Sequence, residues 1–265
     1  MKKTVLITGC SSGFGKAMCE TFAKAGYFVI ATARDESKLT EVNAELKLRL
    51  DVSDDNSVLA AVSRAYEEAG RIDLLVNNAG YSFRSAIEDI DVCQLREMYE
   101  VNVFGMIRMM ETVIPIIRQQ GGGRIYNIGS ISGRMTGLVN GGYCSSKYAV
   151  ESITEAARYE TADMGIEICV IEPGAMDTDF FRTLASNSDE KMKDPSSKYR
   201  EYYERDLAFR AKQSKSDVSE CARVLVEIDK KRKLKVRYTV GVSLVYRVFT
   251  KLPDGLKELF VRRFY

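Results

Sequence analysis

Residues 8 to 15 read Thr8-Gly9-Cys10-Ser11-Ser12-Gly13-Phe14-Gly15, a glycine-rich turn between two regularly patterned segments. The apolar run Val5-Leu6-Ile7 before it predicts a buried strand, and the apolar periodicity of residues 14–25 after it predicts a helix. Strand, turn and helix in this order are typical of a dinucleotide-binding turn, because glycines let the backbone approach a pyrophosphate and the helix offers free N–H groups. A glycine-rich turn alone is weak evidence, since an ordinary helix-entry loop can look the same, and its flanks decide for the dinucleotide.

Alternation of strands and helices continues along the whole chain. Further strands are predicted at 28–31, 48–50, 74–76, 124–128, 168–171 and 236–240, and further helices at 36–46, 54–69, 92–119, 143–164 and 217–230. This order predicts a doubly wound α/β Rossmann fold, with a parallel sheet of about seven strands and helices on both faces. We interpret 1–265 as a single dinucleotide-binding catalytic domain, with a substrate flap at 174–215 and a short helical carboxyl-terminal extension at 244–265.

Composition narrows the class of protein. The chain has no histidine, which excludes Ser-His-Asp hydrolysis and zinc sites built on imidazole, so we expect no metal. Its six cysteines form no C-x-x-C pair, and the first residues do not resemble a secretion signal. Reduced thiols and a cytoplasmic location are therefore expected.

Positive charge is concentrated late in the chain. Residues 212–265 hold fourteen Lys and Arg against six Asp and Glu, although the net charge of the whole chain is only +2. These charges alternate with apolar residues as on a solvated helix face, which argues against a nucleic-acid partner. No apolar run approaches the roughly 20 residues that span a bilayer, so no integral membrane segment is expected and only peripheral membrane contact stays open.

The end of the second predicted strand bears on the choice of dinucleotide. An NAD site places a carboxylate there for the ribose hydroxyls, but the sequence reads Thr32-Ala33-Arg34. The Arg34 guanidinium suits a 2′-phosphate, which favours NADP (NADPH) over NAD. The alternative is that Arg34 is a surface residue paired with Asp35 or Glu36. Farther on, Asp51 and Val52 follow the third strand, where the carboxylate could bond the adenine amino group.

Chemistry is suggested by Tyr143 and Lys147, which are spaced as Y-x-x-x-K on a predicted helix and so share one face. The ammonium would lower the pKa of the phenol and ease proton exchange with a carbonyl or alcohol oxygen. That spacing occurs by chance about once in a chain of this composition, so its neighbours carry the argument. Ser130 follows a strand at the edge where α/β folds bind ligands, and its hydroxyl could polarise the same oxygen.

These motifs together resemble the short-chain dehydrogenase/reductase family, from Val5 to about Val240. The matching residues are the turn 8–15, Asp51, Asn77-Asn78-Ala79-Gly80, Asn102, Ser130, Tyr143, Lys147, Pro173-Gly174 and Thr178. The resemblance implies that Tyr143 is the general acid in reduction and the base in oxidation, and that Ser130 orients the carbonyl. It implies that Lys147 binds the nicotinamide ribose and tunes Tyr143, and that Asn102 holds a proton-relay water beside Lys147. The implied cofactor-binding residues are Gly9, Ser11, Ser12, Gly13, Phe14, Gly15, Arg34, Asp51, Val52, Asn78, Ala79, Gly80, Tyr143, Lys147, Pro173, Gly174 and Thr178.

The substrate is less well defined by the sequence. Arg34 and the carboxyl-terminal segments are similar to the hydroxysteroid and retinol dehydrogenase branch, which implies an apolar small-molecule ketone or alcohol. Phe249, Phe260 and Phe264, with the tyrosines at 199–203, could wall its pocket, or could instead pack a core or subunit contact. A non-catalytic NADP(H)-sensing module is the alternative function. The resemblance also implies a homodimer or homotetramer formed through the helices 92–119 and 143–164.

Overall fold

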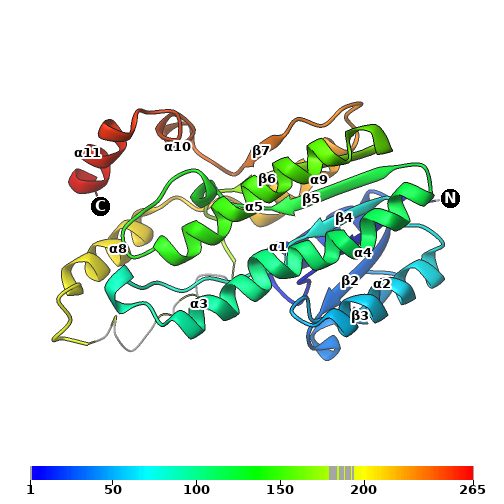
Figure 1. The fold of residues 1–265 in the computed structure, drawn as a ribbon, viewed down its shortest axis with the longest axis horizontal. Coiled ribbons are helices and arrows are strands. Elements are labelled where there is room, and N and C mark those ends of the chain that lie inside the picture. The colour runs from blue at the N-terminus through cyan, green and yellow to red at the C-terminus, as the bar shows by residue number, and fades with distance from the viewer. Residues whose placement is uncertain (1, 179–183, 185–187, 189–191, 193, 265) are drawn as a thin grey trace.

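The computed structural model describes residues 2–178, 184, 188, 192 and 194–264. Its centre is a parallel sheet of seven strands in the order β3-β2-β1-β4-β5-β6-β7 (Figure 1). The strands are β1 (Thr4–Ile7), β2 (Phe28–Ala33), β3 (Leu46–Arg49), β4 (Leu74–Asn77), β5 (Gly123–Ile128), β6 (Ile166–Pro173) and β7 (Arg237–Val240). The predicted doubly wound Rossmann fold is confirmed.

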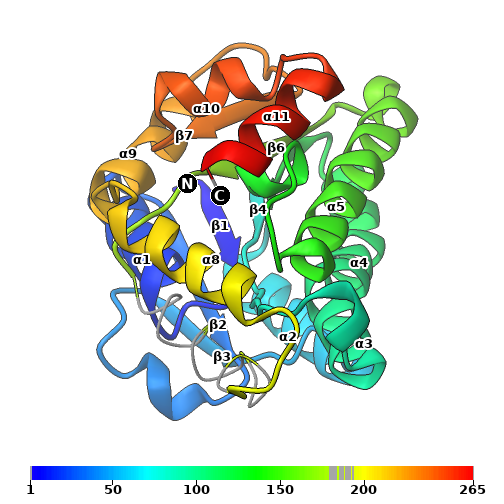
Figure 2. The same cartoon turned by 90° about the vertical axis from the view of Figure 1, so that its left-hand side faces the viewer.

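Helices cover both faces of the sheet, as Figure 2 shows. One face carries α1 (Gly13–Lys24) and α9 (Val218–Asp229), and the other carries α2 (Asp55–Ala69), α4 (Gly105–Gln119) and α5 (Gly141–Glu160). The structure also describes η1 (Glu36–Leu39), η2 (Ile87–Asp89), α3 (Val92–Tyr99), η3 (Glu100–Phe104), η4 (Ile131–Gly133), η5 (Ala162–Met164), α8 (Arg200–Lys212), α10 (Leu244–Phe249) and α11 (Asp254–Phe264).

Strand β1 illustrates how the sequence produces two cores. Successive side chains of a strand point to opposite faces, so Val5 and Ile7 pack towards α1 and α9 whereas Leu6 packs towards α2 and α4. All three are at most 1% exposed. A central parallel strand needs this continuous apolar run because helices bury both of its faces.

Two predicted elements differ in the structure. The helix expected at 36–46 is wrong: a 3₁₀ turn ends at Leu39, and the chain enters β3 at Leu46, before the predicted start at 48. The Glu45 carboxylate accepts a hydrogen bond from the Val29 backbone N–H at 2.8 Å, which holds the segment at the sheet edge instead. The single helix expected at 92–119 is instead α3, the π-helical turn η3 and α4 in succession. The helix is therefore wider than an α-helix at η3, which contains Asn102.

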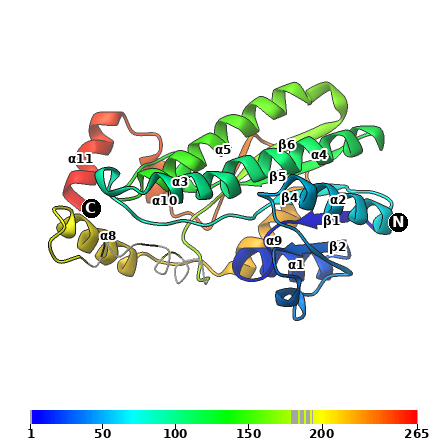
Figure 3. The same cartoon turned by 60° about the horizontal axis from the view of Figure 1, so that its bottom comes forward.

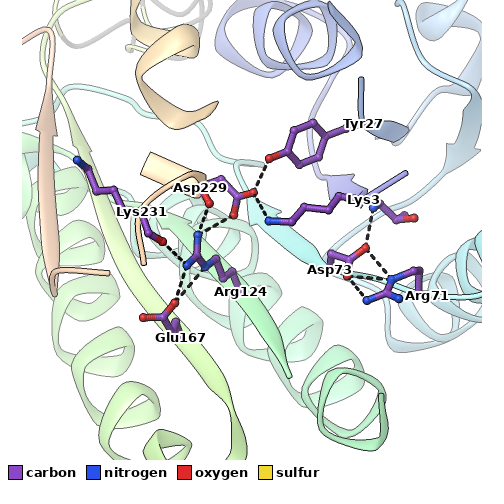
Figure 4. A network of polar contacts seen from close by, with 9 residues as sticks. Lys3, Tyr27, Arg71, Asp73, Arg124, Glu167, Asp229 and Lys231 are labelled. Carbon is purple, nitrogen blue, oxygen red and sulfur yellow. Dashed lines mark hydrogen bonds and ion pairs between the residues drawn. The ribbon is translucent and has the colours of Figure 1, made fainter. Parts of the chain in front are cut away.

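A polar network ties together the edge of the sheet where the strands begin (Figure 4). The buried Asp229 carboxylate pairs with Lys3 at 3.0 Å and with Arg124 at 3.1 Å, and it accepts a hydrogen bond from the Tyr27 hydroxyl. Arg124 also donates to the Lys231 carbonyl at 2.6 Å. The end of α9 is thereby fixed to the starts of β1, β2 and β5.

The last helices gather at the other end of the molecule, where α8, α10 and α11 lie together (Figure 3). Arg205 of α8 donates to the Arg262 carbonyl of α11 at 3.1 Å, and the rings of Phe249 and Phe260 lie 4.9 Å apart between α10 and α11. The expected helical carboxyl-terminal extension is thus present. Within the described part of the chain, no helix has the length and apolar character needed to cross a membrane. Of the expected flap at 174–215, residues 179–183, 185–187, 189–191 and 193 lie outside the described residues.

Candidate active site

A cleft of about 1390 Å³ lies at the edge where the strands end. Its floor is the junction of β1 and β4, where the strand order reverses direction from β1-β2-β3 to β4-β5-β6. Open α/β sheets bind their ligands at this switch point, because the loops after the neighbouring strands diverge there. Every residue predicted to bind the cofactor lines this cleft: Gly9, Ser11, Ser12, Gly13, Phe14, Gly15, Arg34, Asp51, Val52, Asn78, Ala79, Gly80, Tyr143, Lys147, Pro173, Gly174 and Thr178.

The glycine-rich turn is shaped by close backbone approaches. Gly9 adopts φ +72°, and a Cβ on it would lie 2.9 Å from the Ala79 Cα. A Cβ on Gly15 would lie only 2.2 Å from the Gly9 carbonyl oxygen, so no larger residue fits at that position. The Asn78 side chain holds the turn by donating to the carbonyls of Thr8 at 2.9 Å and Gly9 at 3.1 Å. Since α1 begins at Gly13, its free N–H groups face the cleft.

Basic side chains occupy the cleft at the end of β2. Arg34 follows the last residue of β2, and Lys38, which the sequence reasoning missed, lines the same cavity from the η1 turn. Asp51 accepts hydrogen bonds from the backbone N–H of Ser53 at 3.0 Å and from its hydroxyl at 2.6 Å. Burial raises the pKa of the Asp51 carboxyl, but these hydrogen bonds outweigh burial and hold it below its usual value. The carboxylate is therefore charged at neutral pH.

Ser130, Tyr143 and Lys147 meet on one wall of the cleft. Ser130 caps the η4 turn after β5, where its hydroxyl accepts the Ser132 N–H at 3.1 Å. Tyr143 and Lys147 lie one turn apart on α5, and the ammonium is 5.9 Å from the centre of the phenol ring. The Lys147 Nζ donates to the Ile128 carbonyl at 2.8 Å, which anchors it to the end of β5.

The pKa of Tyr143 is shifted in the direction opposite to the predicted one. Burial raises the pKa of Tyr143 to about 12, although a hydrogen bond with Ser130 and the charge of Arg84 oppose the rise. Burial lowers the pKa of the Lys147 ammonium from 10.5 to about 8, against the opposing charge of Glu151. Both shifts follow chiefly from the removal of these two groups from water, which outweighs the attraction of a nearby charge. Tyr143 is therefore protonated at neutral pH.

Asn102 lies behind this wall, outside the main cleft. Its side chain accepts the Tyr81 N–H at 3.0 Å and donates to the Tyr81 carbonyl at 2.9 Å and to the Ser146 hydroxyl at 3.2 Å. Asn102 lines a second cavity of about 10 Å³ together with Thr8, Asn77 and Lys147 among others, and Lys147 also lines the main cleft. The Asn77 side-chain oxygen is buried there without a hydrogen-bond partner among the described atoms. A polar cavity of this size accommodates one water molecule.

Several residues that line the cleft belong to none of the sequence motifs. Met135, Met176, Phe209 and Tyr246 line the same cleft as Tyr143, as do Arg84 and Arg210. Both guanidiniums face the buried Asp206 carboxylate, Arg84 at 3.6 Å and Arg210 at 2.7 Å. Only the apolar spacing of their helices could have suggested Phe209 and Tyr246, and nothing in the local sequence marks Arg84.

The described aromatic residues that could have walled the substrate pocket pack against other parts of the protein instead, which was the alternative interpretation. Phe249 is 3% exposed and packs against Phe260, and neither lines the cleft. Tyr203 is also buried, with its hydroxyl bound to the Ala86 N–H and the Asp89 carboxylate, and Tyr199 and Tyr202 lie outside the cleft. The side chain of Phe264 lies outside the described residues. Aromatics at this spacing fill the gap between helices before they can face a ligand.

Comparison with known proteins agrees with the geometry. Residues 3–189 match the family model described as short chain dehydrogenase. The chain is similar to a 3-ketodihydrosphingosine reductase of Bacteroides thetaiotaomicron, with 31% identity over 98% of this chain and 97% of that protein. It is also 38% identical to an NADP-dependent 3-hydroxy acid dehydrogenase of Schizosaccharomyces pombe, over 67% of this chain and 73% of that protein. Among solved structures, a short-chain dehydrogenase from Streptomyces avermitilis matches with a TM-score of 0.83 and 28% identity, over 99% of this chain and 96% of that one. The chain therefore belongs to the short-chain dehydrogenase family of oxidoreductases.

Proposed function

We propose that this oxidoreductase uses NADP(H) to interconvert a carbonyl group and a secondary or primary alcohol, with Ser130, Tyr143 and Lys147 as its catalytic residues. One observation carries the proposal: these three side chains line the same cleft as the glycine-rich turn and Arg34. A dinucleotide lying across the switch point joins the two ends of the cleft. The volume of the cleft, about 1390 Å³, exceeds the range usual for small-ligand pockets, roughly 300–1,000 Å³. A cleft of this size suits a large cofactor together with a substrate.

The residues present fit NADP. Gly9 and Gly15 leave a backbone cradle that any Cβ would fill, and the amino terminus of α1 offers N–H groups for the pyrophosphate. Arg34 and Lys38 together supply two positive charges where an NAD site has a carboxylate, which suits a 2′-phosphate. The Schizosaccharomyces pombe relative, described as NADP-dependent, supports this preference. When bound, the cofactor supplies or accepts the hydride.

The proton chemistry belongs to the protein. Tyr143, which its raised pKa keeps protonated at neutral pH, donates its phenolic proton to the carbonyl oxygen in reduction. The Ser130 hydroxyl, hydrogen-bonded to Tyr143, orients the same oxygen. Lys147 lies between Tyr143 and the small polar cavity at Asn102, so we assign it the return of a proton to Tyr143 through one water molecule.

We assign an apolar substrate, a hydrophobic ketone or the corresponding alcohol of the steroid or retinoid kind. Met135, Met176, Phe209 and Tyr246 line the cleft that also holds Tyr143, and long flexible or aromatic side chains suit a large apolar ligand. The Bacteroides relative, a 3-ketodihydrosphingosine reductase, supports a ketone on a hydrophobic molecule.

We also propose that copies of the chain associate through α4 and α5. Phe104 at the start of α4 is 45% exposed, and Tyr148 and Tyr159 on α5 are 45% and 66% exposed. Exposed aromatics on neighbouring helices are enriched at subunit contacts. Light scattering on the purified protein and on a Tyr148→Ser, Tyr159→Ser variant measures this directly, and a wild-type monomer would refute it.

The test of the reaction is loss of NADPH absorbance with a panel of ketones and aldehydes, from small polar compounds to steroids and retinal, with NADH in parallel. We expect turnover of apolar ketones with NADPH and loss of turnover in Tyr143→Phe, with NADPH binding retained. Binding without turnover of any panel member would favour a non-catalytic NADP(H)-sensing module. Faster turnover with NADH would refute the role given to Arg34.

A further inference from the structure

The two carboxyl-terminal helices expose an unusual amount of apolar surface. We call the following residues the C-terminal apolar face: Leu244, Val245 and Val248 on α10, and Leu256 and Leu259 on α11. Each is at least half exposed, and Leu244 reaches 75%. Single exposed apolar residues are ordinary, but five on two helices that contact each other through Phe249 and Phe260 form a patch that needs an explanation.

Packing onto the protein does not account for this face. The opposite side of the same helices is already apolar and occupied, since Phe249 is 3% exposed and stacks against Phe260. A helix that is apolar on both sides is normally buried on both sides. Here the inner side packs against the protein and the outer side is left for another apolar phase.

The charges on the outer side are positive. Arg247 on α10 and Arg263 on α11 follow Leu244 and Leu259 by three and four residues, which is the spacing of a shared helix side, and Lys251 lies exposed in the turn just after α10. None of these three has a carboxylate partner among the described residues, whereas the acids of α11, Asp254 and Glu258, pair with Lys257 and Arg262 within that helix. The outer side therefore combines apolar side chains with unneutralised positive charge.

This face adjoins the mouth of the cleft. Tyr246 of α10 lines the cleft, and its hydroxyl accepts a hydrogen bond from Gln213 at the end of α8 at 3.4 Å. Its neighbours Val245 and Arg247 are exposed. One short helix thus forms part of the cleft wall with one side chain and part of the outer face with the next.

We propose that the C-terminal apolar face binds the surface of an anionic lipid bilayer, with the cleft mouth turned towards the lipid. The leucines and valines enter the boundary between head groups and acyl chains, and Arg247, Lys251 and Arg263 contact lipid phosphates. A second copy of the chain fits this face less well, because a two-fold contact would bring the same positive charges together. The binding does not depend on the proposed reaction, although it gives a lipid-dissolved ketone a direct path to Tyr143.

The experiment is co-sedimentation of the purified full-length protein with vesicles of phosphatidylcholine alone or mixed with phosphatidylglycerol. We expect sedimentation with the mixed vesicles only, weakening as salt is added. Val248→Ser and Leu259→Ser should each weaken the partition by roughly tenfold, since each removes apolar area from the lipid phase. Lys251→Glu with Arg263→Glu should abolish it.

Two control variants test whether the effect is specific to this face. Leu59→Ser removes a leucine that is 54% exposed on α2, far from the face, and should leave the partition unchanged. Lys231→Gln with Lys233→Gln removes charge from the basic run beside Arg124 at the opposite end of the molecule. Turnover of a water-soluble aldehyde, measured without vesicles, reports separately on the reaction and on folding. Equal loss in the controls, no binding to anionic vesicles, or an oligomer that Val248→Ser dissociates would overturn the proposal.

Discussion

The rate of reduction should fall as pH rises through about 8, because Lys147 loses its proton there. Burial disfavours the charged form of a lysine, which is the protonated one, and so lowers the pKa of this ammonium from 10.5 to about 8. About nine-tenths of the ammonium is present at pH 7, about one-tenth at pH 9 and about one-hundredth at pH 10. If proton return to Tyr143 needs that ammonium, kcat for reduction should drop about 90-fold from pH 7 to pH 10.

The assay is kcat from NADPH absorbance at saturating ketone, with NADPH affinity followed by fluorescence over the same pH range. Lys147→Arg keeps its charge at all these pH values, so its lower activity should show no inflection near pH 8. Tyr143, with a pKa of about 12, cannot produce that inflection. A wild-type rate that stays level to pH 10, or an inflection near 8 that persists in Lys147→Arg, would refute the assignment of the proton path to Lys147.

Three further outcomes follow from the same contacts. Tyr143→Phe should lower kcat by about 10²–10⁴-fold while the NADPH dissociation constant stays within experimental error, as stopped-flow and fluorescence titration can measure. Arg34→Ala should weaken NADPH binding by about 10–100-fold and leave NADH binding unchanged, and equal weakening of both would contradict a contact with the 2′-phosphate. Asp229→Ala removes the carboxylate shared by Lys3, Tyr27 and Arg124, although Arg124 keeps its ion pair with Glu167. It should lower the unfolding free energy by about 1–3 kcal/mol in a denaturant titration, whereas Asp254→Ala on the surface should not change the midpoint.

The sequence predicted which residues gather at the end of the cleft that holds the glycine-rich turn, because most of that end is built from short contiguous motifs. Gly15 is required by an approach of 2.2 Å to the Gly9 carbonyl within the same turn, whereas Gly9 is required by an approach of 2.9 Å to Ala79 in the loop after β4. Arg34 could be placed because a strand end has a fixed position in a parallel sheet. Such positions depend on local order along the chain and on the rules of strand connection.

Properties that depend on burial could not be predicted in the same way. The spacing of Tyr143 and Lys147 indicated an attractive charge, but the pKa of the tyrosine follows chiefly from the removal of water around it. The helix expected at 36–46 failed for a related reason, since Glu45 finds a partner in Val29 of the neighbouring strand rather than within a helix. A tertiary contact of this kind outweighs a local preference worth less than about 1 kcal/mol per residue.

The substrate end of the cleft is encoded in a different part of the chain from the chemistry. The family model matches residues 3–189, whereas Phe209, Arg210 and Tyr246 come from α8 and α10, beyond that match. Membership of the family therefore indicates the class of reaction, an oxidoreduction, but not the substrate. Because α8 and α10 also lie next to the C-terminal apolar face, a change in these helices alters substrate fit and surface binding together. Swapping residues 200–265 with those of a relative should therefore change substrate choice, while the proposed preference for NADPH, which we assign to Arg34 and Lys38, should stay in place.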